Sequence, residues 1–312
     1  MKLMKKGIIV LLGLLVMAVA LSACARNNEP AETTRTITDR DGYTTTVPSE
    51  ISTIVSLGPS NAEILVALGL GDKIIAVDRY SADVVGLGAG VPRSFGIMDF
   101  DVEYIMELMP DIIFATDMIR AGGDDDPMAP ISAVGITVVY VPISASIAAI
   151  MEDIQFIANV MGTYDAGQAI ITQMQTEIDR IAYIAATISA PRTVYFEISP
   201  APWMFSFGQG TFLHEMIELV GAVNIFASQE GWVGVSEEVL LELDPDVILT
   251  SSGEILDDPV AEIMGRPGFD ILTAVQNNSV FEIDTAASNQ PSHNIIIALR
   301  QIAEAVFPEY FL

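Results

Sequence analysis

Side chains that commonly do catalytic or metal chemistry are scarce in this chain. Its 312 residues include two histidines, His214 and His293, and one cysteine, Cys24. Neither histidine lies at a metal-ligand spacing from the other or from the cysteine, so we expect no metal site. An EF-hand loop starting at Asp124 would need a glutamate where the chain has Gly135. With no G-x-S-x-G motif and no P-loop, we expect neither an enzyme nor a bound cofactor.

Large aromatic side chains in predicted loops indicate a binding site instead. Tyr80 follows the apolar run "KIIAVD", Trp203 and Phe205 follow "TVYFEIS", and Trp232 lies in "EGWVGVS". Rings at strand ends that face a gap between two lobes would line a pocket for a bulky ligand. Structural packing is the alternative for any single ring, whereas the group as a whole favours a pocket.

One phrase of the sequence occurs twice at an offset of 135 positions, as "DVEYIMELMPDIIFA" and "VSEEVLLELDPDVILTS". Asp101 corresponds to Ser236, and Glu103 corresponds to Glu238. If Asp101 and Ser236 are N-caps, each glutamate is the second residue of a helix, in the exposed first turn. The helix dipole favours a negative charge there, and this alone would explain both glutamates. Their identical placement also suits contact with a two-fold symmetric partner.

The elements that must position these residues alternate along the chain. Short apolar runs without polar alternation are separated by helical patterns, which predicts parallel sheets covered on both faces. The runs are "STIVSLG", "KIIAVD", "DIIFAT" and "TVVYVP", followed by "TVYFEIS", "DVILTS" and "SVFEID". "SNAEILVALGLG" predicts a helix with Ser60 or Asn61 as its N-cap. "MFSFGQG" is expected to be extended or a loop, and "HNIIIALRQIAEAVF" a terminal helix.

One predicted helix is longer than a single small domain needs. Residues 164–188 contain no proline and have apolar residues near helical spacing. At 1.5 Å per residue such a helix is about 37 Å long and could bridge two lobes. We therefore expect an α/β fold of two lobes, with an N-terminal lobe at 36–160, a connecting helix within 161–190 and a C-terminal lobe at 191–312.

The N-terminus has the pattern of a bacterial export signal. A basic start is followed by an apolar run of about 14 residues and by Leu21-Ser22-Ala23-Cys24. This ending resembles the lipobox of lipoproteins, which implies cleavage after residue 23 and lipidation of Cys24. A plain secretory signal with an incidental cysteine is the alternative. Residues 24–35 are polar and predict a flexible tether.

The charge of the chain excludes two classes of partner. The formal net charge is −27. Without the three lysines of the signal, 11 basic residues face 41 acidic ones. Such a surface is repelled by nucleic acid and by anionic lipid, so we expect no nucleic-acid partner. Membrane attachment is expected to rely on the lipid anchor.

Taken together, these segments resemble one family. The stretch "IVSLGPSNAEILVALGLGDKIIAVDRYS", the repeated phrase, "GTFLHEMIELVGAVNIF" and the ending "FPEYF" are similar to the iron-complex and cobalamin class of ABC-importer substrate-binding proteins (class III). The resemblance covers the chain from about residue 36 and depends on the order and spacing of the segments. It implies two Rossmann-like lobes with parallel sheets, joined by one rigid helix, and a cleft that delivers cargo to a membrane permease.

The resemblance also implies partners and a location. In this family one exposed glutamate per lobe docks onto the permease, and the matching positions are Glu103 and Glu238. The implied partner is an ABC permease dimer with its ATPase subunits. The protein is expected to be a monomer, lipid-anchored through Cys24 at the outer face of the cytoplasmic membrane or in the periplasm.

The cargo implied by the resemblance is a corrinoid or a ferric chelate. Cobalamin-binding members have aromatic residues where this chain has Tyr80 and Trp232, and an acid near Asp284. Two departures are Ile97, at a position that can be tryptophan, and "YSADV", which lacks a second aromatic residue. Anionic ferric catecholates need cationic partners, and near the predicted loops of the first lobe the chain offers only Lys73, Arg79, Arg93 and Arg120.

A neutral or cationic cargo is therefore favoured. The expected ligand-binding residues are Tyr80, Arg93, Arg120, Trp203, Phe205, Trp232 and Asp284. A haem-binding receptor of the same class remains an alternative, with Tyr80 or His214 as the axial ligand. A surface lipoprotein with no transport role and a secreted α/β enzyme are the alternatives from other classes.

Overall fold

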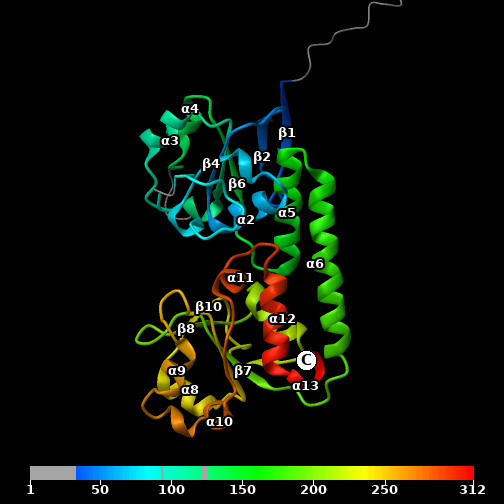
Figure 1. Cartoon of the computed structure of the whole chain (residues 1–312), viewed down its shortest axis with the longest axis vertical. Coiled ribbons are helices and arrows are strands. Elements are labelled where there is room, and N and C mark those ends of the chain that lie inside the picture. Colours follow the sequence, from blue (N-terminus) through cyan, green and yellow to red (C-terminus); the bar gives the residue numbers. More distant parts are fainter. Residues whose placement is uncertain (1–32, 93–94, 121–125) are drawn as a thin grey trace, which may run out of the picture.

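The computed structural model describes residues 33–92, 95–120 and 126–312, which form two lobes beside a pair of long helices (Figure 1). The predicted signal peptide, Cys24, Arg93 and Asp124 lie outside the described residues. No helix within the described ranges is both long enough and apolar enough to span a bilayer.

The N-terminal lobe is built on a four-stranded parallel sheet in the order β4-β3-β5-β6. Its central strands are almost entirely buried, as their continuous apolar sequences predict. The strands are β3 (Ile54–Leu57), β4 (Ile74–Val77), β5 (Ile112–Thr116) and β6 (Thr137–Val141). The helical segments are α2 (Pro59–Ala67), η1 (Gly71–Lys73), η2 (Arg79–Ser81), α3 (Val102–Leu108), η3 (Asp117–Ile119) and α4 (Ala129–Ala133).

The C-terminal lobe repeats this topology with the sheet β12-β11-β7-β9, which is also parallel. In each lobe the first strand along the chain lies between the second and the third. The strands are β7 (Thr193–Glu197), β9 (Val223–Asn224), β11 (Val247–Thr250) and β12 (Val280–Glu282). The helical segments are α7 (Phe212–Leu219), α8 (Glu237–Leu243), α9 (Pro259–Met264), η4 (Phe269–Ile271), α10 (Thr273–Gln276), α11 (Thr285–Asn289), α12 (Ile295–Val306) and α13 (Pro308–Phe311). The predicted two-lobe α/β fold is confirmed.

Two small antiparallel pairs flank these sheets. The hairpin of β1 (Thr34–Thr38) and β2 (Thr44–Pro48) precedes the first lobe. The strands β8 (Phe205–Phe207) and β10 (Trp232–Gly234) pair within the second lobe, with Trp232 opposite Phe207. Sequence patterns did not indicate the first pair and left the second as extended or loop, because strands of three to five residues carry little periodicity.

The helices α5 (Ile147–Met161) and α6 (Tyr164–Ala185) run along one side of both lobes (Figure 1). Helix α6 packs against α5 of the first lobe and against α7 and α12 of the second. Its buried face includes Met174, Ile178 and Ile181, at helical spacing. One hydrophobic cluster joins residues of both lobes through these helices. The predicted long helix is therefore present, and it ends at Ala185.

The repeated phrase forms the same local structure in each lobe. The Asp101 side chain accepts a hydrogen bond from the Tyr104 amide at 3.0 Å, which caps α3. Ser236 caps α8 in the same way. Both helices end at a left-handed residue, Met109 with φ 46° and Asp244 with φ 40°. The predicted N-caps of both repeated helices are confirmed.

The aspartate of each Pro-Asp pair joins two neighbouring strands. A carboxylate oxygen of Asp111 accepts the backbone amides of Ser52 and Thr53 just before β3, at 2.8 and 2.9 Å. Asp246 accepts the amide and the hydroxyl of Thr193 at the start of β7, both at 2.8 Å. The aspartate of the repeat therefore holds the start of a central strand, β3 in one sheet and β7 in the other.

The N-cap of α2 differs from the prediction. The helix begins at Pro59, and its N-cap is Gly58 rather than Ser60 or Asn61. Proline suits the first helical position because the amide hydrogen that it lacks would have no intrahelical partner there. Gly58 has φ 120°, a conformation open to glycine. This tight turn brings the start of α2 to the gap between the lobes.

Candidate functional site

A cavity of about 430 Å³, here called the apolar cleft, lies between the two lobes. Its N-terminal side is formed at the carboxyl ends of β3, β5 and β6, where α/β sheets commonly bind ligands. Most of its lining is apolar, and among the described lining residues Asp153 is the one charged side chain. Its lining includes Tyr80, Met118, Pro142, Ile143, Ser144, Asp153, Phe212, Trp232 and Gln290.

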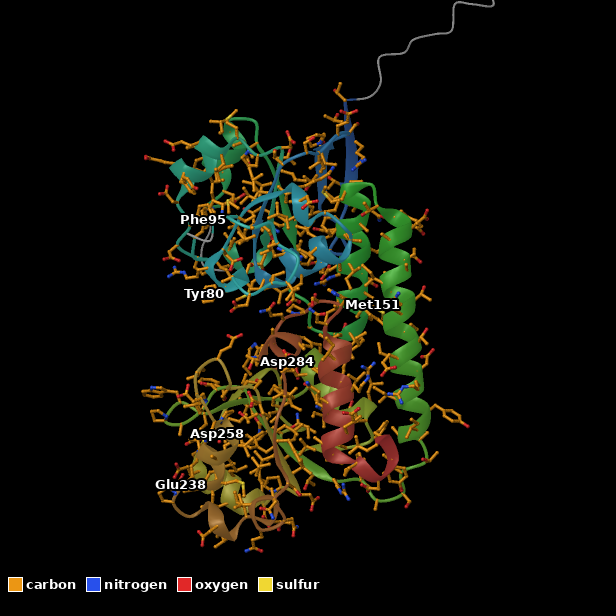
Figure 2. The ribbon with its side chains drawn as sticks, viewed as in Figure 1. Tyr80, Phe95, Met151, Glu238, Asp258 and Asp284 are labelled. Atoms are coloured by element: carbon orange, nitrogen blue, oxygen red, sulfur yellow. The ribbon has the colours of Figure 1, made fainter. Side chains whose placement is uncertain are left out.

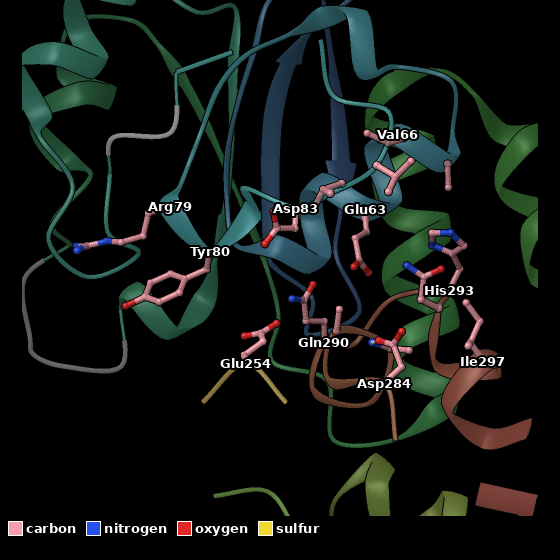
Figure 3. Close-up of a pocket in the computed structure, with 16 residues that line it drawn as sticks. Glu63, Val66, Arg79, Tyr80, Asp83, Glu254, Asp284, Gln290, His293 and Ile297 are labelled. Atoms are coloured by element: carbon pink, nitrogen blue, oxygen red, sulfur yellow. Dashed lines mark hydrogen bonds between the residues drawn. The ribbon is translucent and has the colours of Figure 1, made fainter. Parts of the chain in front are cut away.

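A second cavity of about 670 Å³, the acidic cavity, shares Tyr80 and Gln290 with the apolar cleft (Figure 3). Its ionisable lining residues are Glu63, Arg79, Asp83, Glu254, Asp284 and His293. Figure 2 shows Tyr80 and Asp284 on the facing lobes. The two cavities together form one interlobe region with an apolar half and an acidic half.

The acidic cavity has no surplus of positive charge. The Arg79 guanidinium lies 2.7 Å from both carboxylate oxygens of Asp99. It extends away from Glu63 and Asp284 (Figure 3). Burial lowers the pKa of His293 and so favours its neutral form. Its Nδ1 atom is buried and has no hydrogen-bond partner. An anionic ligand would therefore find no free cation among the described lining residues.

Glu63 links the lobes at the edge of the acidic cavity. It lies on α2 of the first lobe, is 7% exposed, and accepts a hydrogen bond from the Ser292 hydroxyl of the second lobe. Burial raises the pKa of Glu63, and the hydrogen bonds from Ser292 and Asn294 partly oppose this effect. A second link is made by Glu215 of α7, which accepts the amide of Ile147 at the start of α5 at 2.7 Å.

The position of Tyr80 is fixed by the fully buried Asp78. One oxygen of Asp78 accepts the Tyr80 amide at 2.9 Å and thereby caps η2. The other accepts the Gly58 amide at 2.8 Å and the Ser81 hydroxyl at 2.6 Å. A single carboxylate thus orients the Tyr80 segment and the α2 turn, and both line the apolar cleft.

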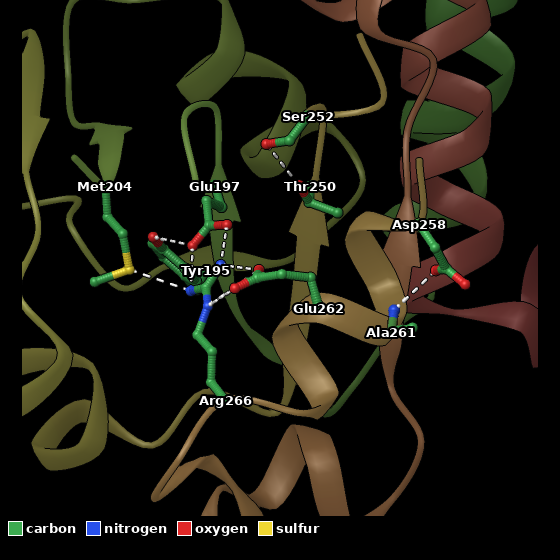
Figure 4. A network of polar contacts seen from close by, with 9 residues as sticks. All are labelled: Tyr195, Glu197, Met204, Thr250, Ser252, Asp258, Ala261, Glu262 and Arg266. Carbon is green, nitrogen blue, oxygen red and sulfur yellow. Dashed lines mark hydrogen bonds and ion pairs between the residues drawn. The ribbon is translucent and has the colours of Figure 1, made fainter. Parts of the chain in front are cut away.

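The opposite wall is stabilised by a buried ion pair. The Arg266 guanidinium lies 2.7 Å from Glu197 at the end of β7 and also pairs with Glu262 (Figure 4). It contacts the sulfur of Met204 at 3.2 Å. The Met204 carbonyl in turn accepts the Val235 amide at 2.9 Å, next to the β8–β10 pair that includes Trp232. Burial lowers the pKa of Arg266, but its bonds to the two glutamates outweigh this and keep the pKa above its usual value.

The structure brings some of the predicted ligand residues together and separates others. Tyr80 and Trp232 line the same apolar cleft from opposite lobes, and Asp284 lines the acidic cavity. Trp203 is 77% exposed on a turn after β7 and does not line either cavity. Phe205, at the start of β8, is 43% exposed and does not line them either.

Two further candidates also lie away from the cavities. Arg120 is held by Asp117 and lies over the Tyr140 ring, 4.1 Å from its centroid. It does not line either cavity. His214, the proposed alternative haem ligand, is buried between Asn224 and Glu218, 3.3 and 3.4 Å away. Both side chains are occupied by partners: Asp117 and Glu218 lie at i,i+3 and i,i+4 spacing, whereas the contacts to Tyr140 and Asn224 form only in the folded chain.

Sequence reasoning missed several residues that line the apolar cleft. These are apolar or amide side chains without an aromatic or charge signal, such as Met118, Ile143, Phe212 and Gln290. Only the position of these residues along the chain could have indicated a role in the cleft. Met118 and Ile143 follow the ends of β5 and β6, where ligand-binding loops are expected.

Glu103 and Glu238 are exposed at the second position of α3 and α8, as predicted. Local backbone and Ser236 hydrogen bonds lower the pKa of Glu238, which keeps it ionised. Within the described residues, no group of three or more histidine, cysteine, aspartate or glutamate side chains is placed to hold a metal ion.

Comparison with known proteins agrees with this architecture. The family model for periplasmic binding proteins matches residues 54–287, from the first strand of the N-terminal sheet to α11 of the C-terminal lobe. The chain belongs to the periplasmic binding protein family. The resemblance expected from the sequence is confirmed, and this periplasmic binding protein is a substrate-binding protein of the ABC-transporter type.

Individual relatives of this periplasmic binding protein cover most of its length. It is 29% identical to the uncharacterised ABC transporter substrate-binding lipoprotein YvrC of Bacillus subtilis, over 99% of both chains. It is 28% identical to a vitamin B12-binding protein of Vibrio cholerae, over 82% of this chain and 89% of that one. The crystal structure of the periplasmic vitamin B12-binding protein BtuF of Vibrio cholerae is similar, with a TM-score of 0.66 and 26% identity over 82% and 96% of the chains.

Proposed function

We propose that this protein captures a corrinoid, or a ferric chelate of similar size and charge, in the interlobe region and delivers it to an ABC permease. The observation that carries the proposal is the apolar cleft, with Tyr80 and Trp232 on its two sides. Aromatic walls of this kind suit a large, flat, partly apolar ring system. The vitamin B12-binding relatives support the corrinoid as first choice.

The charge of the acidic cavity favours some classes of cargo over others. Among the described residues of the acidic cavity, Glu63, Asp83, Glu254 and Asp284 face one arginine that is already paired. A strongly anionic ferric catecholate would need cationic partners. The arrangement favours a neutral or cationic cargo, such as a corrinoid or a ferric hydroxamate. Haem is the second candidate, because the Tyr80 phenol lies in the cleft and could coordinate iron.

Location and partners complete the proposal. A lipid on Cys24 would anchor the mature protein at the outer face of the cytoplasmic membrane, and residues 24–35 would act as the tether. Glu103 and Glu238 would dock onto a permease dimer that works with ATPase subunits. Exposed ion pairs contribute roughly 0.2–1 kcal/mol each. These contacts would therefore orient the protein on the permease more than they would raise its affinity.

Thermal shifts on the chain from Ala25 onward test the cargo assignment. The panel is cyanocobalamin, cobinamide, a ferric hydroxamate, a ferric catecholate and haem. At a hundredfold excess over Kd, the true cargo stabilises the fold by about 2.7 kcal/mol. We expect the corrinoids to raise the melting temperature and the catecholate to leave it unchanged. If no compound raises it, the proposed cargo class is wrong and the surface-lipoprotein alternative is favoured.

A further inference from the structure

The loop between β6 and α5 forms part of the N-terminal wall of the apolar cleft. Pro142, Ile143 and Ser144 all line the cleft, and the Ile143 side chain is 54% exposed toward solvent. The loop has no regular secondary structure between Val141 and Ile147. Its position must therefore be set by contacts with its neighbours.

Asp153 of α5 lies beneath this loop. It is 2% exposed and lines the apolar cleft. One carboxylate oxygen accepts a hydrogen bond from the Ser144 hydroxyl in the loop, and the other accepts the Arg40 Nε–H at 2.9 Å. Both oxygens are thus used for contacts within the first lobe.

Arg40 joins three parts of the lobe that are distant in sequence. It belongs to the turn between β1 and β2, and a second nitrogen, Nη2, donates to the Ile143 carbonyl at 2.7 Å. A weaker contact joins Nη1 to the exposed Asp41 at 3.4 Å. The planar guanidinium therefore connects the hairpin and α5 to the wall of the cleft, and a lysine, with its single point of charge, could not make both inner contacts.

The energetics make this connection sensitive to substitution. Burial raises the pKa of Asp153 to about 6, and the bonds from Ser144 and Arg40 partly oppose that effect. Without Arg40, a buried carboxylate would lose its charge partner, which is a strongly unfavourable state. The Ile143 carbonyl would lose its donor at the same time. Both losses would loosen the loop 142–144.

We propose that Arg40 and Asp153 are positioning residues for cargo binding, because they hold the loop 142–144 as a preformed wall of the apolar cleft. This inference rests on the proposed function. It gives the β1–β2 hairpin a role beyond joining the tether to the lobe. A preformed wall raises affinity because the loop does not have to be ordered when the cargo binds.

Four variants and two readouts test the proposal. Arg40→Gln and Asp153→Asn break the connection, whereas Arg40→Lys keeps one charge contact. Arg180→Gln is the matched control, because Arg180 is a half-exposed arginine that pairs with Glu177 on α6, away from the cleft. The readouts are hydrogen exchange of the amides of residues 143–147 without ligand and the Kd for cyanocobalamin, both at a temperature where circular dichroism shows every variant folded.

We expect faster exchange in the loop and a Kd about tenfold higher in Arg40→Gln and Asp153→Asn, equal to about 1.4 kcal/mol. Arg40→Lys should be intermediate, and Arg180→Gln should match the wild type. Unchanged exchange and unchanged Kd in the first two variants would overturn the proposal. Faster exchange with unchanged Kd would overturn the binding role and leave only a structural one. If the wild type itself binds no cyanocobalamin, the corrinoid assignment fails, which the exchange data distinguish from a failure of the loop contacts.

Discussion

At the scale of residues, fully buried acids determine where the binding side chains lie. Asp78 orients Tyr80, and Glu197 with Arg266 supports the β8–β10 pair that includes Trp232. Breaking a buried ion pair on one side leaves an uncompensated charge, whereas replacing both partners with apolar groups is often tolerated. The two cases give different predictions for Arg266.

Arg266→Met should lower the free energy of unfolding by about 3–5 kcal/mol, because it leaves the buried Glu197 carboxyl group without its partner. Adding Glu197→Leu should recover much of this loss. Urea denaturation at pH 7 measures both values. Arg180→Met is the control, since the Arg180 side chain is about half exposed and Glu177 keeps Arg300 as a second partner, so the loss should be about 1 kcal/mol or less. A loss of similar size in Arg180→Met and Arg266→Met would contradict the assigned role of burial.

Residue types alone identified part of the site. Tyr80 and Trp232 were expected because large rings at strand ends that face a gap can line a pocket, although the same signal also selected Trp203 and Phe205, which line neither cavity. Arg40 and Asp153 were not predictable, since their contact joins positions 113 apart in the chain and neither residue lies in a motif. Arg120 and His214 line neither cavity, because Asp117 and Tyr140 hold the first and Asn224 and Glu218 surround the second.

At the scale of elements, the two repeated helices have equivalent positions in the two lobes. Each begins with a capping side chain followed by an exposed glutamate. Each is followed by a Pro-Asp pair whose aspartate bonds to the start of a neighbouring strand. The repeat was readable from the sequence because its spacing is exact. The β1–β2 and β8–β10 pairs were not, because short strands that pair across irregular loops leave no periodic pattern.

Replacing both glutamates, Glu103→Lys and Glu238→Lys, should reduce cargo-dependent uptake by cells to background while the Kd for cargo stays within about twofold of wild type. The reason is that two repulsive contacts would replace two attractive ones at the permease, away from the cleft. Glu107→Lys with Glu242→Lys is the matched control, because these residues lie one turn further along the same helices and are also exposed. Equal loss of uptake and of cargo affinity would show that the docking surface is misassigned.

At the scale of the whole molecule, helix packing, a shared hydrophobic cluster and polar contacts link the two lobes. Helix α6 packs on both lobes, one hydrophobic cluster passes between them, and Glu63 and Glu215 form polar links across the gap. The long helix predicted this architecture, because its length exceeds the need of one lobe. The shape of the cleft itself was not predictable, because it arises from loops of both lobes that meet only after folding.

We propose above all that the cleft between the lobes binds the cargo through aromatic residues from each lobe. The most direct test of this proposal is a calorimetric titration of cyanocobalamin into the wild type, Trp232→Ala and Trp203→Ala. We expect one site per chain in the wild type and an affinity about thirtyfold lower in Trp232→Ala, equal to roughly 2 kcal/mol. Trp203→Ala should bind like the wild type, because Trp203 lies outside both cavities. No saturable binding to the wild type, or equal loss in both tryptophan variants, would contradict the claim.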